Sequence, residues 1–440
     1  MKVMILAPYI YDENMIEFTK NKTGFGIMVR NIVSSVGKLE DVVLITRVIT
    51  KKKSKENFTI LSHTWKQFFL NAKLKDWLMG IRGFLGDNVT FKDRIRHFFY
   101  EADGGYVRKQ IQMEKPDIVH IHGIGTITES YIRICHEMKV EYAVTLHGLI
   151  GMNDSISAPA YEKQIEYDFL VKAENNDIPV SVISSGMKVR IEEKYLKRKA
   201  NNIVVITNGV KKSEVNDKNF IQKKGTLDET FLEHYSNCLK QTDSYPELND
   251  IYNFLKYSKK NGKKILFFVG NITSNKNQIQ AVEMLKNRKI CDNIVLVLWG
   301  REVDAGKVRK KIVEYKLQRN VILGGFNDRM DDFWELCDVN LFLSLNDGFG
   351  LPIVEGYMHG IPCITFEDLD ATQDLYYPEA MLKVKDRSTE SVIDTLKVAL
   401  DKKWNNKEII KVGNLFSIDI MSQKYVNWYR TIKETVAGNS

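Results

Sequence analysis

The sequence predicts an α/β protein made of two doubly wound domains, each with a parallel sheet that is covered by helices. Its 440 residues are too many for one ordinary core and fit two domains of about 150–200 residues. Short apolar runs rich in β-branched residues alternate with helical stretches in both halves of the chain. These runs are almost continuously apolar, which is typical of parallel strands buried on both faces.

The first domain is expected over residues 1–210. Its predicted strands are VMILAPYI, DVVLITRVI, PDIVHIHG, EYAVTLHG, IPVSVISS and NIVVITNG. Helices are predicted between several of them, over Phe25–Val36, Glu129–Met138 and Tyr161–Glu174. This succession of strand, helix and strand is typical of a Rossmann-like domain.

An insertion over residues 51–105 interrupts this first domain. Between Lys51 and Arg96 the chain carries eleven Lys and Arg against four Asp and Glu, interleaved with aromatic residues. This composition has three interpretations: a solvated helical insertion whose aromatics pack inward, a contact with an anionic membrane, or a nucleic-acid surface. No nucleic-acid motif supports the third, so nucleic acid is not an expected partner.

The pattern of strands stops after residue 210 and starts again at Lys264. Residues 211–263 are polar, rich in Lys and Asn, and are expected to form an insertion and linker with one helix in LDETFLEHYSNCLKQ. A second Rossmann-like domain is expected over 264–415, with strands KILFFVGNI, NIVLVLWG, NVILGGF, VNLFLSL and PCITF. The tail 416–440 has the apolar spacing of a helix and is expected to cross back toward the first domain.

The composition also excludes several kinds of protein. No apolar run approaches the roughly 18–20 residues that a membrane span needs. The start of the chain, MKVMILAPYIY, is predicted to be a buried strand and not a secretory signal. The five cysteines are scattered without a C-x-x-C pair, which argues against disulfides and zinc sites. The expected location is a reducing cytoplasm, or a peripheral position on the inner face of the membrane.

The stretch SLNDGFGLPIVEGYMHGIPCI, residues 344–364, holds the most unusual chemistry. A strand is predicted to end at Ser344 and a short helix to begin near Pro352, so the backbone amides of Gly350 and Leu351 would face an anion at the helix N-terminus. Glycines at 348 and 350 would let a ligand approach the backbone.

Two acids, Asp347 and Glu355, lie on either side of these glycines. Facing phosphates they would repel them, whereas each could accept two hydrogen bonds from a pair of sugar hydroxyls. One acid on a sugar and the other on a ribose would suit a nucleotide-sugar. The alternative is that Asp347 is a turn residue and Glu355 a solvated helix acid.

The sequence DGFGLPIVEGYMHGIPCI resembles the signature of the retaining glycosyltransferases of family 4, which have the two-domain GT-B fold. That signature usually reads E-G-F-G-L-P-x-x-E-A-M-A-x-G-x-P-V-I. The chain keeps the spacing of the two acids, the FGLP core, Glu355, Gly360 and Pro362. It departs from the pattern at Asp347, which is one methylene shorter than the usual Glu.

The resemblance implies a donor site in the second domain. GNITSNKNQIQAVEML is similar to an element whose lysine, here Lys276, contacts the donor phosphates. Asn271 stands where that element normally has a second phosphate-binding arginine, and Arg301 is the candidate to replace its charge. The full set of implied donor-binding residues is Asn271, Lys276, Gly325, Phe326, Gly348, Phe349, Gly350, Leu351 and Glu355, with Gly325 and Phe326 at the base.

The resemblance also extends to the first domain. TGFGIMVRNI is similar to the loop that closes over the diphosphate, which implies Gly24 and Gly26. TLHG implies that His147 faces the anomeric carbon, although a histidine at a strand end is often structural. His120 and His122, also at a strand end, are interpreted as packing or acceptor-side residues.

The implied activity is that of a retaining hexosyl- or N-acetylhexosaminyl-transferase. It would use a nucleoside-diphosphate sugar, most often UDP-linked in this family, bound in a central cleft between the two domains. The implied catalytic residues are His147, Lys276, Asp347 and Glu355, and neither a metal nor another cofactor is expected. The acceptor would be a glycan, glycolipid or protein in the assembly of a bacterial-type surface polysaccharide or glycoconjugate.

Two other interpretations of the chain stay open at this point. A catalytically degenerate subunit, which binds substrate or a partner transferase, would account for Asn271 and Asp347. A sugar-nucleotide epimerase or a phosphorylase on the same fold would need acid–base carboxylates or a pyridoxal lysine, and neither can be located in the sequence.

Overall fold

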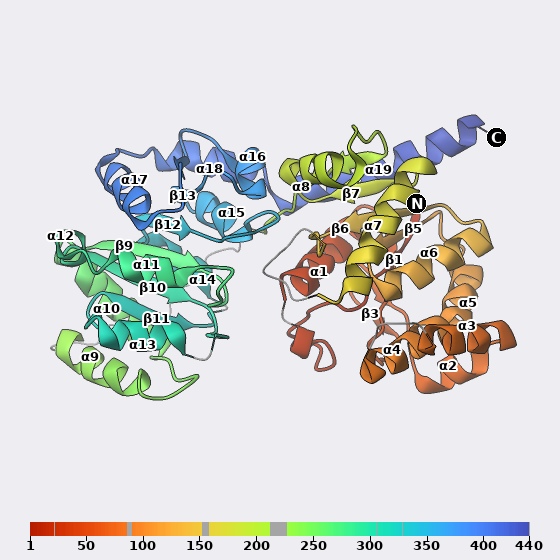
Figure 1. Cartoon of the computed structure of the whole chain (residues 1–440), viewed down its shortest axis with the longest axis horizontal. Coiled ribbons are helices and arrows are strands. Elements are labelled where there is room, and N and C mark those ends of the chain that lie inside the picture. Colours follow the sequence, from red (N-terminus) through yellow and green to blue (C-terminus); the bar gives the residue numbers. More distant parts are fainter. Residues whose placement is uncertain are drawn as a thin grey trace. The chain divides into compact units, whose positions relative to one another are not determined.

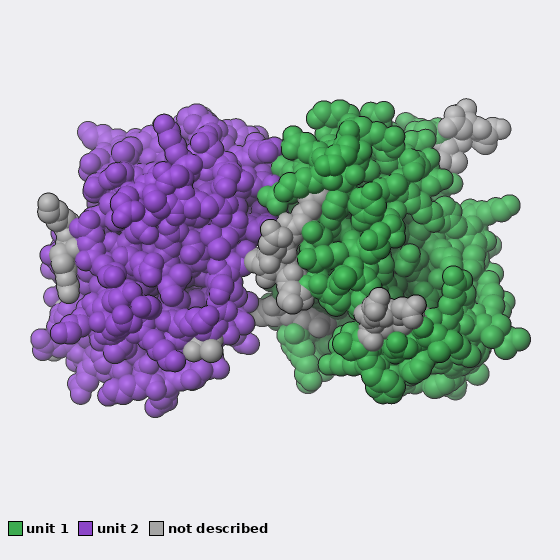
Figure 2. Space-filling model, viewed as in Figure 1, with its two compact units in different colours: residues 1–209, 418–440 green, residues 210–417 purple. Residues whose placement is uncertain are grey.

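A computed structural model of the chain divides into two compact units, coloured separately in Figure 2. Unit 1 comprises Met1–Gly209 and Ile418–Ser440, and unit 2 comprises Val210–Ser417. Within the described ranges, no helix is both long and apolar enough to cross a membrane. The structure describes residues 1–21, 23–85, 90–151, 158–211, 227–304, 306–327 and 329–439.

Unit 1 is built on a sheet whose described strands follow the order β3-β4-β2-β1-β5-β6-β7-β8. All neighbouring strands are parallel except β3 and β4, which form an antiparallel pair at one edge. The strands are β1 (Lys2–Leu6), β2 (Asp41–Ile45), β3 (Lys53–Ser54), β4 (Thr59–Ile60), β5 (Ile118–His122), β6 (Tyr142–Leu146), β7 (Val180–Val182) and β8 (Ile203–Val205). The central strands β5 and β6 are buried along their whole length, as their continuous apolar sequences predict.

Helices cover this sheet on both faces (Figure 1). They are α1 (Gly24–Val36), α2 (Trp65–Asn71), α3 (Leu74–Phe84), α4 (Phe91–Ala102), α5 (Gly104–Glu114), α6 (Thr126–Met138), α7 (Ala160–Asn175), α8 (Ser185–Arg190) and α19 (Ile418–Asn439), with a short 3₁₀ turn at Thr19–Asn21 and a π-helical turn at Ile191–Leu196. The region expected as an insertion contributes β3, β4 and α2 to α4, and its residues 86–89 lie outside the described residues.

The last helix, α19, packs on α1 and joins the core of unit 1. Its apolar stripe is buried, including Met421, Tyr425 and Trp428. The Tyr429 hydroxyl lies 2.6 Å from Nδ1 of His120, the buried histidine of β5. The C-terminus of the chain therefore completes the unit formed by its N-terminus.

Unit 2 has a wholly parallel sheet with the strand order β11-β10-β9-β12-β13-β14 among its described residues. Its strands are β9 (Lys264–Val269), β10 (Ile294–Trp299), β11 (Val321–Gly325), β12 (Val339–Phe342), β13 (Cys363–Phe366) and β14 (Met381–Val384). Its helices are α9 (Leu227–Cys238), α10 (Leu248–Lys260), α11 (Gln278–Met284), α12 (Arg288–Cys291), α13 (Lys307–Glu314), α14 (Met330–Phe333), α15 (Leu351–Met358), α16 (Asp370–Leu375), α17 (Thr389–Asp401) and α18 (Asn406–Asn414), with a 3₁₀ turn at Trp334–Leu336.

The second part of the region expected as an insertion and linker, 211–263, forms α9 and α10 and belongs to unit 2. The helix expected in LDETFLEHYSNCLKQ corresponds to α9. The rings of Phe231 and Phe254 stack with their centroids 4.4 Å apart, and both are buried. The Tyr235 hydroxyl donates to the Val321 carbonyl at 2.9 Å, which joins α9 to the edge strand β11. The polar composition of this segment concealed these few aromatic anchors, so the linker prediction was wrong here; residues 212–226 lie outside the described residues.

Candidate functional site

The candidate site of unit 2 lies at the topological switch point of its sheet, where the order of strand addition reverses. Strand β9 comes first in the chain and pairs with β10 on one side and β12 on the other. The connections that follow β9 and β12 therefore run to opposite faces and leave a crevice at their carboxyl ends, where doubly wound sheets bind ligands. The segments that carry Lys276 and Asp347 follow these two strands.

Two hydrogen bonds join the loops after β9 and β12. The amide of Leu345 donates to the Asn275 carbonyl at 2.7 Å, and the side-chain amide of Asn275 donates to the Asn346 carbonyl at 2.9 Å. Asn275 therefore holds Lys276 and Asp347 close together. The sequence offered no signal for this role, because the two loops are about 70 residues apart and one asparagine among many carries the contact.

Lys276 forms an ion pair with Asp347, through Nζ and Oδ2. The lysine side chain is 25% exposed and the aspartate side chain 17%. The ammonium group also lies 5.2 Å from the centroid of the Phe342 ring, at the end of β12. The structure thus places a partly buried cation at the carboxyl end of the sheet, and in the protein without ligand its partner is the first acid of the motif.

The other oxygen of Asp347 holds the turn that leads into helix α15, which has no side-chain cap of its own. Its Oδ1 accepts hydrogen bonds from the amides of Phe349 at 3.1 Å and Gly350 at 2.8 Å. Gly350 has φ +78°, and a Cβ atom there would lie 2.9 Å from the Ile353 side chain. The Gly350 amide, expected to face a ligand, is therefore used by the chain itself, because a short Asp side chain can turn back onto the amides two and three residues ahead.

Glu355 lies in α15 with intermediate exposure. Burial of its carboxyl raises its pKa to about 7, and the nearby charge of Asp331 contributes in the same direction. Asp331 lies 2.8 Å from Nε2 of His359, whose ring stacks on Trp334. The sequence did not point to Asp331 or His359, since neither belongs to a recognisable motif.

Asn271 and Arg301 lie next to each other at the ends of β9 and β10. The Asn271 side-chain oxygen accepts from the Arg301 amide at 3.4 Å, and the Ile272 amide donates to the Arg301 carbonyl at 2.8 Å. Both residues are exposed. Arg301 is thus adjacent to the position where the resemblance implies a missing arginine, and its guanidinium is the nearest replacement that the backbone geometry offers.

Gly325 and Phe326 follow at the end of β11. Gly325 has φ +66°, and a Cβ atom there would lie 2.7 Å from the Tyr245 ring. Phe326 is 40% exposed. Tyr245, which the sequence did not single out, therefore requires glycine at this position, and the exposed ring of Phe326 is suited to stack on a planar group.

In unit 1 the predicted His147 lies beside His122, a residue of strand β5. His122 Nδ1 and His147 Nε2 are 2.9 Å apart, so one donates a proton to the other. Burial lowers the pKa of His147 to about 4, the pKa of His120 to about 3 and the pKa of His122 well below its usual value. All three rings are therefore neutral near pH 7.

The predicted glycine loop reaches the same place in unit 1. Gly24 and Gly26 form the first turn of α1, where the Thr23 hydroxyl accepts from the Gly26 amide at 3.1 Å. Phe25, between them, packs edge-on against His147 with the ring centroids 5.0 Å apart. The structure therefore brings TGFG and His147 together through Phe25, which sequence reasoning did not single out.

The described residues include no group of three or more His, Cys, Asp or Glu that could hold a metal ion. The candidate site holds Lys276 and the acids Asp347 and Glu355, with the exposed Arg301 beside it. The Arg387 guanidinium also reaches it and donates to the Leu345 carbonyl at 3.0 Å. Such a set can bind an anion at Lys276 and hydroxyl groups at Glu355.

Comparisons with known sequences match part of unit 2 to a family model. Residues 249–408 match the family "Glycosyl transferases group 1". A stretch of 100 residues is 31% identical to the poly(glycerol-phosphate) alpha-glucosyltransferase of Bacillus subtilis (strain 168). That stretch is 22% of this chain and spans only 15% of the relative.

Solved structures share the fold over the whole chain. A glycosyltransferase from Rickettsia africae ESF-5 has a TM-score of 0.64 at 15% identity, with 98% of both chains covered. Sucrose-phosphate synthase from Thermosynechococcus elongatus has a TM-score of 0.68 at 14% identity, covering 99% of this chain and all of the other. HepE from Anabaena, solved with UDP-glucose, has a TM-score of 0.57 at 12% identity over both entire chains. The chain therefore has the two-domain GT-B fold, and its unit 2 carries the region that matches the group 1 glycosyl transferases.

Proposed function

We propose that the protein is a glycosyltransferase that moves a sugar from a nucleoside-diphosphate sugar to a hydroxyl acceptor. The observation that carries this proposal is the ion pair of Lys276 with Asp347, in the turn before α15 at the switch point of unit 2. The match of residues 249–408 to the group 1 glycosyl transferases supports it, and so do the named glycosyltransferases among the structures of the same fold.

In this proposal the donor binds to unit 2. Lys276 leaves Asp347 and pairs with the phosphates, whose charge is greater than that of one carboxylate. Glu355 accepts hydrogen bonds from the two ribose hydroxyls, and Phe326 stacks on the base. We propose UDP as the nucleotide, since HepE of the same fold was solved with UDP and with UDP-glucose. A hexose or N-acetylhexosamine would then lie near Asp347 and the backbone of 348–351.

The reaction we propose exchanges one glycosidic bond for another. The bond between the anomeric carbon and the diphosphate breaks, and its electrons pass to the phosphate oxygen. The acceptor oxygen bonds to the anomeric carbon on the face that the leaving group vacates, which retains the configuration, and the acceptor proton passes to the departing phosphate. Lys276 stabilises the charge that develops on that phosphate, so this scheme requires neither a metal nor a cofactor.

We further propose that the acceptor is a glycan, glycolipid or protein in surface polysaccharide or glycoconjugate assembly. The similar proteins support this direction, because one is a poly(glycerol-phosphate) glucosyltransferase and two act in lipopolysaccharide synthesis. A cytoplasmic position, at or near the inner face of the membrane, would suit such a reaction.

A panel of nucleotides and nucleotide-sugars tests the donor site. A ligand at 100 times its Kd should stabilise the protein by about 2.7 kcal/mol, which thermal unfolding detects. We expect UDP and a UDP-hexose to stabilise the wild type, and Lys276→Ala and Glu355→Ala to lose most of this shift. If no nucleotide shifts the melting temperature, the donor site is not where we place it.

A catalytically degenerate subunit is the second candidate. It is favoured by Asn271 in place of a phosphate-binding cation and by the use of both Asp347 oxygens within the chain. This protein would bind a nucleotide but release no sugar from it. Release of UDP from a UDP-sugar, lost in Lys276→Ala, would exclude this candidate, whereas binding without turnover would support it.

A further inference from the structure

The helices α2, α3 and α4, which lie together at one side of unit 1 (Figure 1), expose an unusual number of large apolar side chains. On α3 the exposed fractions are 75% at Leu74, 57% at Leu78, 49% at Ile81 and 64% at Leu85. These positions are spaced by four, three and four residues, so they form one continuous stripe along the helix. A helix of a globular domain normally faces solvent with polar residues, so this stripe has no partner within the described part of unit 1.

A second apolar strip continues the first on α4. Phe91 is 70% exposed and Ile95 is 40% exposed, one helical turn apart. On α2, the exposed apolar residues are Trp65, Phe69 and Leu70. We call the exposed apolar residues of these three helices the apolar face.

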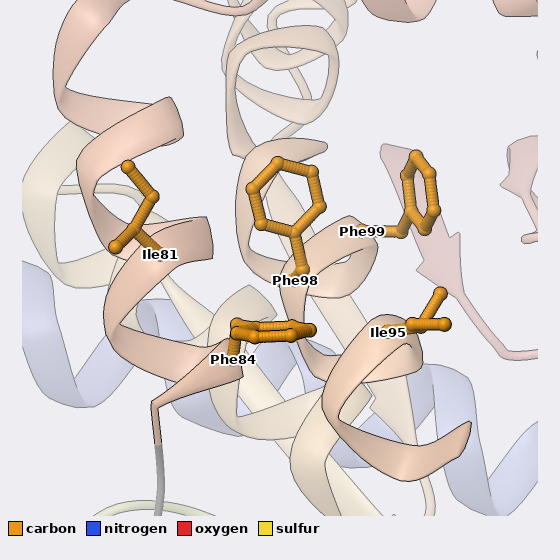
Figure 3. Close-up of a pocket in the computed structure, with 5 residues that line it drawn as sticks. All are labelled: Ile81, Phe84, Ile95, Phe98 and Phe99. Atoms are coloured by element: carbon orange, nitrogen blue, oxygen red, sulfur yellow. The ribbon is translucent and has the colours of Figure 1, made fainter. Parts of the chain in front are cut away.

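A pocket of about 320 Å³ opens within the apolar face, between α3 and α4. Figure 3 shows the side chains that surround it, which are Ile81, Phe84, Ile95, Phe98 and Phe99. All five are apolar, so the pocket offers no group that would hold a polar ligand. It is suited to hydrocarbon.

Helices α3 and α4 pack closely against each other and are anchored to other parts of unit 1. A Cβ atom at Gly80 would lie 3.0 Å from Phe98, so α3 and α4 approach closely at that glycine. Asp76 of α3 forms a buried ion pair with Arg108 of α5, and Asp103 after α4 pairs with Arg47 and lies 3.1 Å from His63. The exposed stripe is therefore a consequence of how these helices are anchored by their other faces.

The charges around the apolar face are of one sign. Among the described residues 65–102, the exposed charged side chains are Lys66, Lys73, Lys75, Arg82, Lys92 and Arg96. The acids among these described residues are buried or partly buried and paired: Asp76 with Arg108, Asp93 with Arg96, and Glu101 with Arg133. Lys75 itself pairs with Glu137 of α6. Lys75 and Arg82 follow Leu74 and Ile81 by one position, so they flank the stripe of α3 along one side.

We propose that the apolar face is a docking surface for a bilayer that contains anionic phospholipid. Leucine and aromatic side chains enter the acyl region, the basic side chains beside them meet phosphate headgroups, and the pocket between α3 and α4 accepts hydrocarbon. The uniform positive charge argues against a second copy of the chain as the occupant, because two such faces would repel each other. Docking would also bring unit 1 to an acceptor carried on a lipid, and this last point rests on the proposed glycosyl transfer.

Sedimentation with vesicles tests the proposal on the full chain without nucleotide. We expect the protein to bind vesicles of phosphatidylcholine with roughly 30% phosphatidylglycerol at about 0.05 M salt, and to bind weakly to pure phosphatidylcholine or at about 0.5 M salt. The double variant Leu74→Glu, Leu78→Glu should lower the partition coefficient about tenfold or more. The control Leu39→Glu replaces a leucine of unit 1 that is 47% exposed and lies outside the apolar face, and it should bind like the wild type.

A charge pair completes the test. Arg82→Glu with Lys92→Glu should weaken binding to the anionic vesicles about tenfold, while Lys424→Glu on α19 should not. Circular dichroism and thermal unfolding confirm that each variant is folded, and because the substituted leucines are more than half exposed, loss of fold is not expected. Absence of vesicle binding by the wild type overturns the proposal, as does binding that the leucine variants leave unchanged.

Two further outcomes identify a different occupant. If sedimentation velocity shows a dimer that Leu74→Glu, Leu78→Glu dissociates, and the vesicles are ignored, a second copy covers the face and the proposal is wrong. If the apolar face binds an acidic protein and the chain does not bind the vesicles, the membrane proposal is also wrong. The nucleotide panel is independent of both results, so failure of the membrane proposal and failure of the donor site can be distinguished.

Discussion

The strand ends of the two units show opposite electrostatics on closely related sheets. At the carboxyl ends of unit 1, three histidines are kept neutral by burial, and His120 is bonded to a tyrosine of α19. At the equivalent ends of unit 2, Lys276 and Asp347 form an ion pair, and burial raises the pKa of Glu355 to about 7. The same architecture thus provides a neutral surface in one unit and a charged one in the other.

This difference matches a division of the proposed reaction. A nucleoside diphosphate carries its charge on the phosphates and needs a cation, whereas an acceptor hydroxyl can form hydrogen bonds with neutral groups. Buried neutral histidines supply the second kind of group without attracting or repelling the phosphates. We therefore expect that substitutions in unit 2 change donor binding and its pH dependence, while substitutions in unit 1 change turnover alone.

The largest effect is expected at Lys276. Lys276→Ala should lower kcat/KM by about 100–1,000-fold, because it removes the cation that pairs with Asp347 at the switch point of unit 2. Lys276→Arg should recover part of the loss, and Lys286→Ala, at an exposed lysine of the same unit, should have little effect. Initial rates of UDP release measure all three. Equal rates for Lys276→Ala and the wild type would break the comparison at its main point.

Glu355 should make donor binding depend on pH. Its carboxyl must be ionised to accept hydrogen bonds from both ribose hydroxyls. With a pKa of about 7, only about a tenth of it is ionised at pH 6. The Kd of a UDP-sugar should therefore be about tenfold weaker at pH 6 than at pH 8, and Glu355→Gln should remove this dependence. Calorimetric titration with the UDP-sugar measures both. A pH dependence retained in Glu355→Gln would assign it to another group.

The same carboxyl should affect stability in a definite direction. Because the folded pKa of Glu355 lies above its ordinary value of 4.5, the folded protein binds the proton more tightly than the unfolded chain does. The stabilising effect of that proton is complete below about pH 4.5 and is lost as the pH rises to about 7. Glu355→Gln should accordingly raise the melting temperature at pH 8 relative to the wild type and leave it nearly unchanged at pH 4.5, with Glu379→Gln as the control.

A substitution at His122 tests whether the buried histidines of unit 1 stay neutral during the reaction. We expect His122→Gln to lower kcat by roughly threefold to tenfold, because His147 loses the partner that orients its ring. The KM for the donor and the shape of the pH profile between 6 and 8 should stay as in the wild type, since the histidines are neutral throughout this range. A shifted profile would show that these rings titrate and that the contrast between the units is smaller than proposed.

The smallest effects are expected at Asp347, where two roles can be separated. Asp347→Asn keeps a side-chain oxygen for the amides of Phe349 and Gly350 but removes the ion pair, so UDP should bind roughly twofold to fivefold more tightly. Asp347→Ala also removes these two hydrogen bonds and should cost about 1 kcal/mol of unfolding free energy. Urea unfolding and UDP titration of the two variants distinguish these roles. Equal stability of the Asn and Ala variants would mean that the two hydrogen bonds contribute little.

Much of this arrangement could be predicted from the sequence, because it depends on local patterns. The continuous apolar runs correspond to strands such as β5 and β6, and the predicted helix Glu129–Met138 corresponds to α6. Residues of the glycine-rich motif do lie at the start of α15. The helix predicted in LDETFLEHYSNCLKQ corresponds to α9. That α9 and α10 belong to unit 2 was not predicted, because Phe231, Tyr235 and Phe254 are widely spaced among polar residues and only their packing identifies them as core.

The sequence by itself determined two doubly wound sheets, the motif at the end of β12 and the excess of basic residues before α5, because each depends on neighbours along the chain. The tertiary structure alone decided which groups meet. It placed Lys276 on Asp347 across two loops, raised the pKa of Glu355 beside Asp331, and joined His147 to His122. It also decided that the leucines of α3 face solvent, since exposure and pKa depend on what packs from distant parts of the chain.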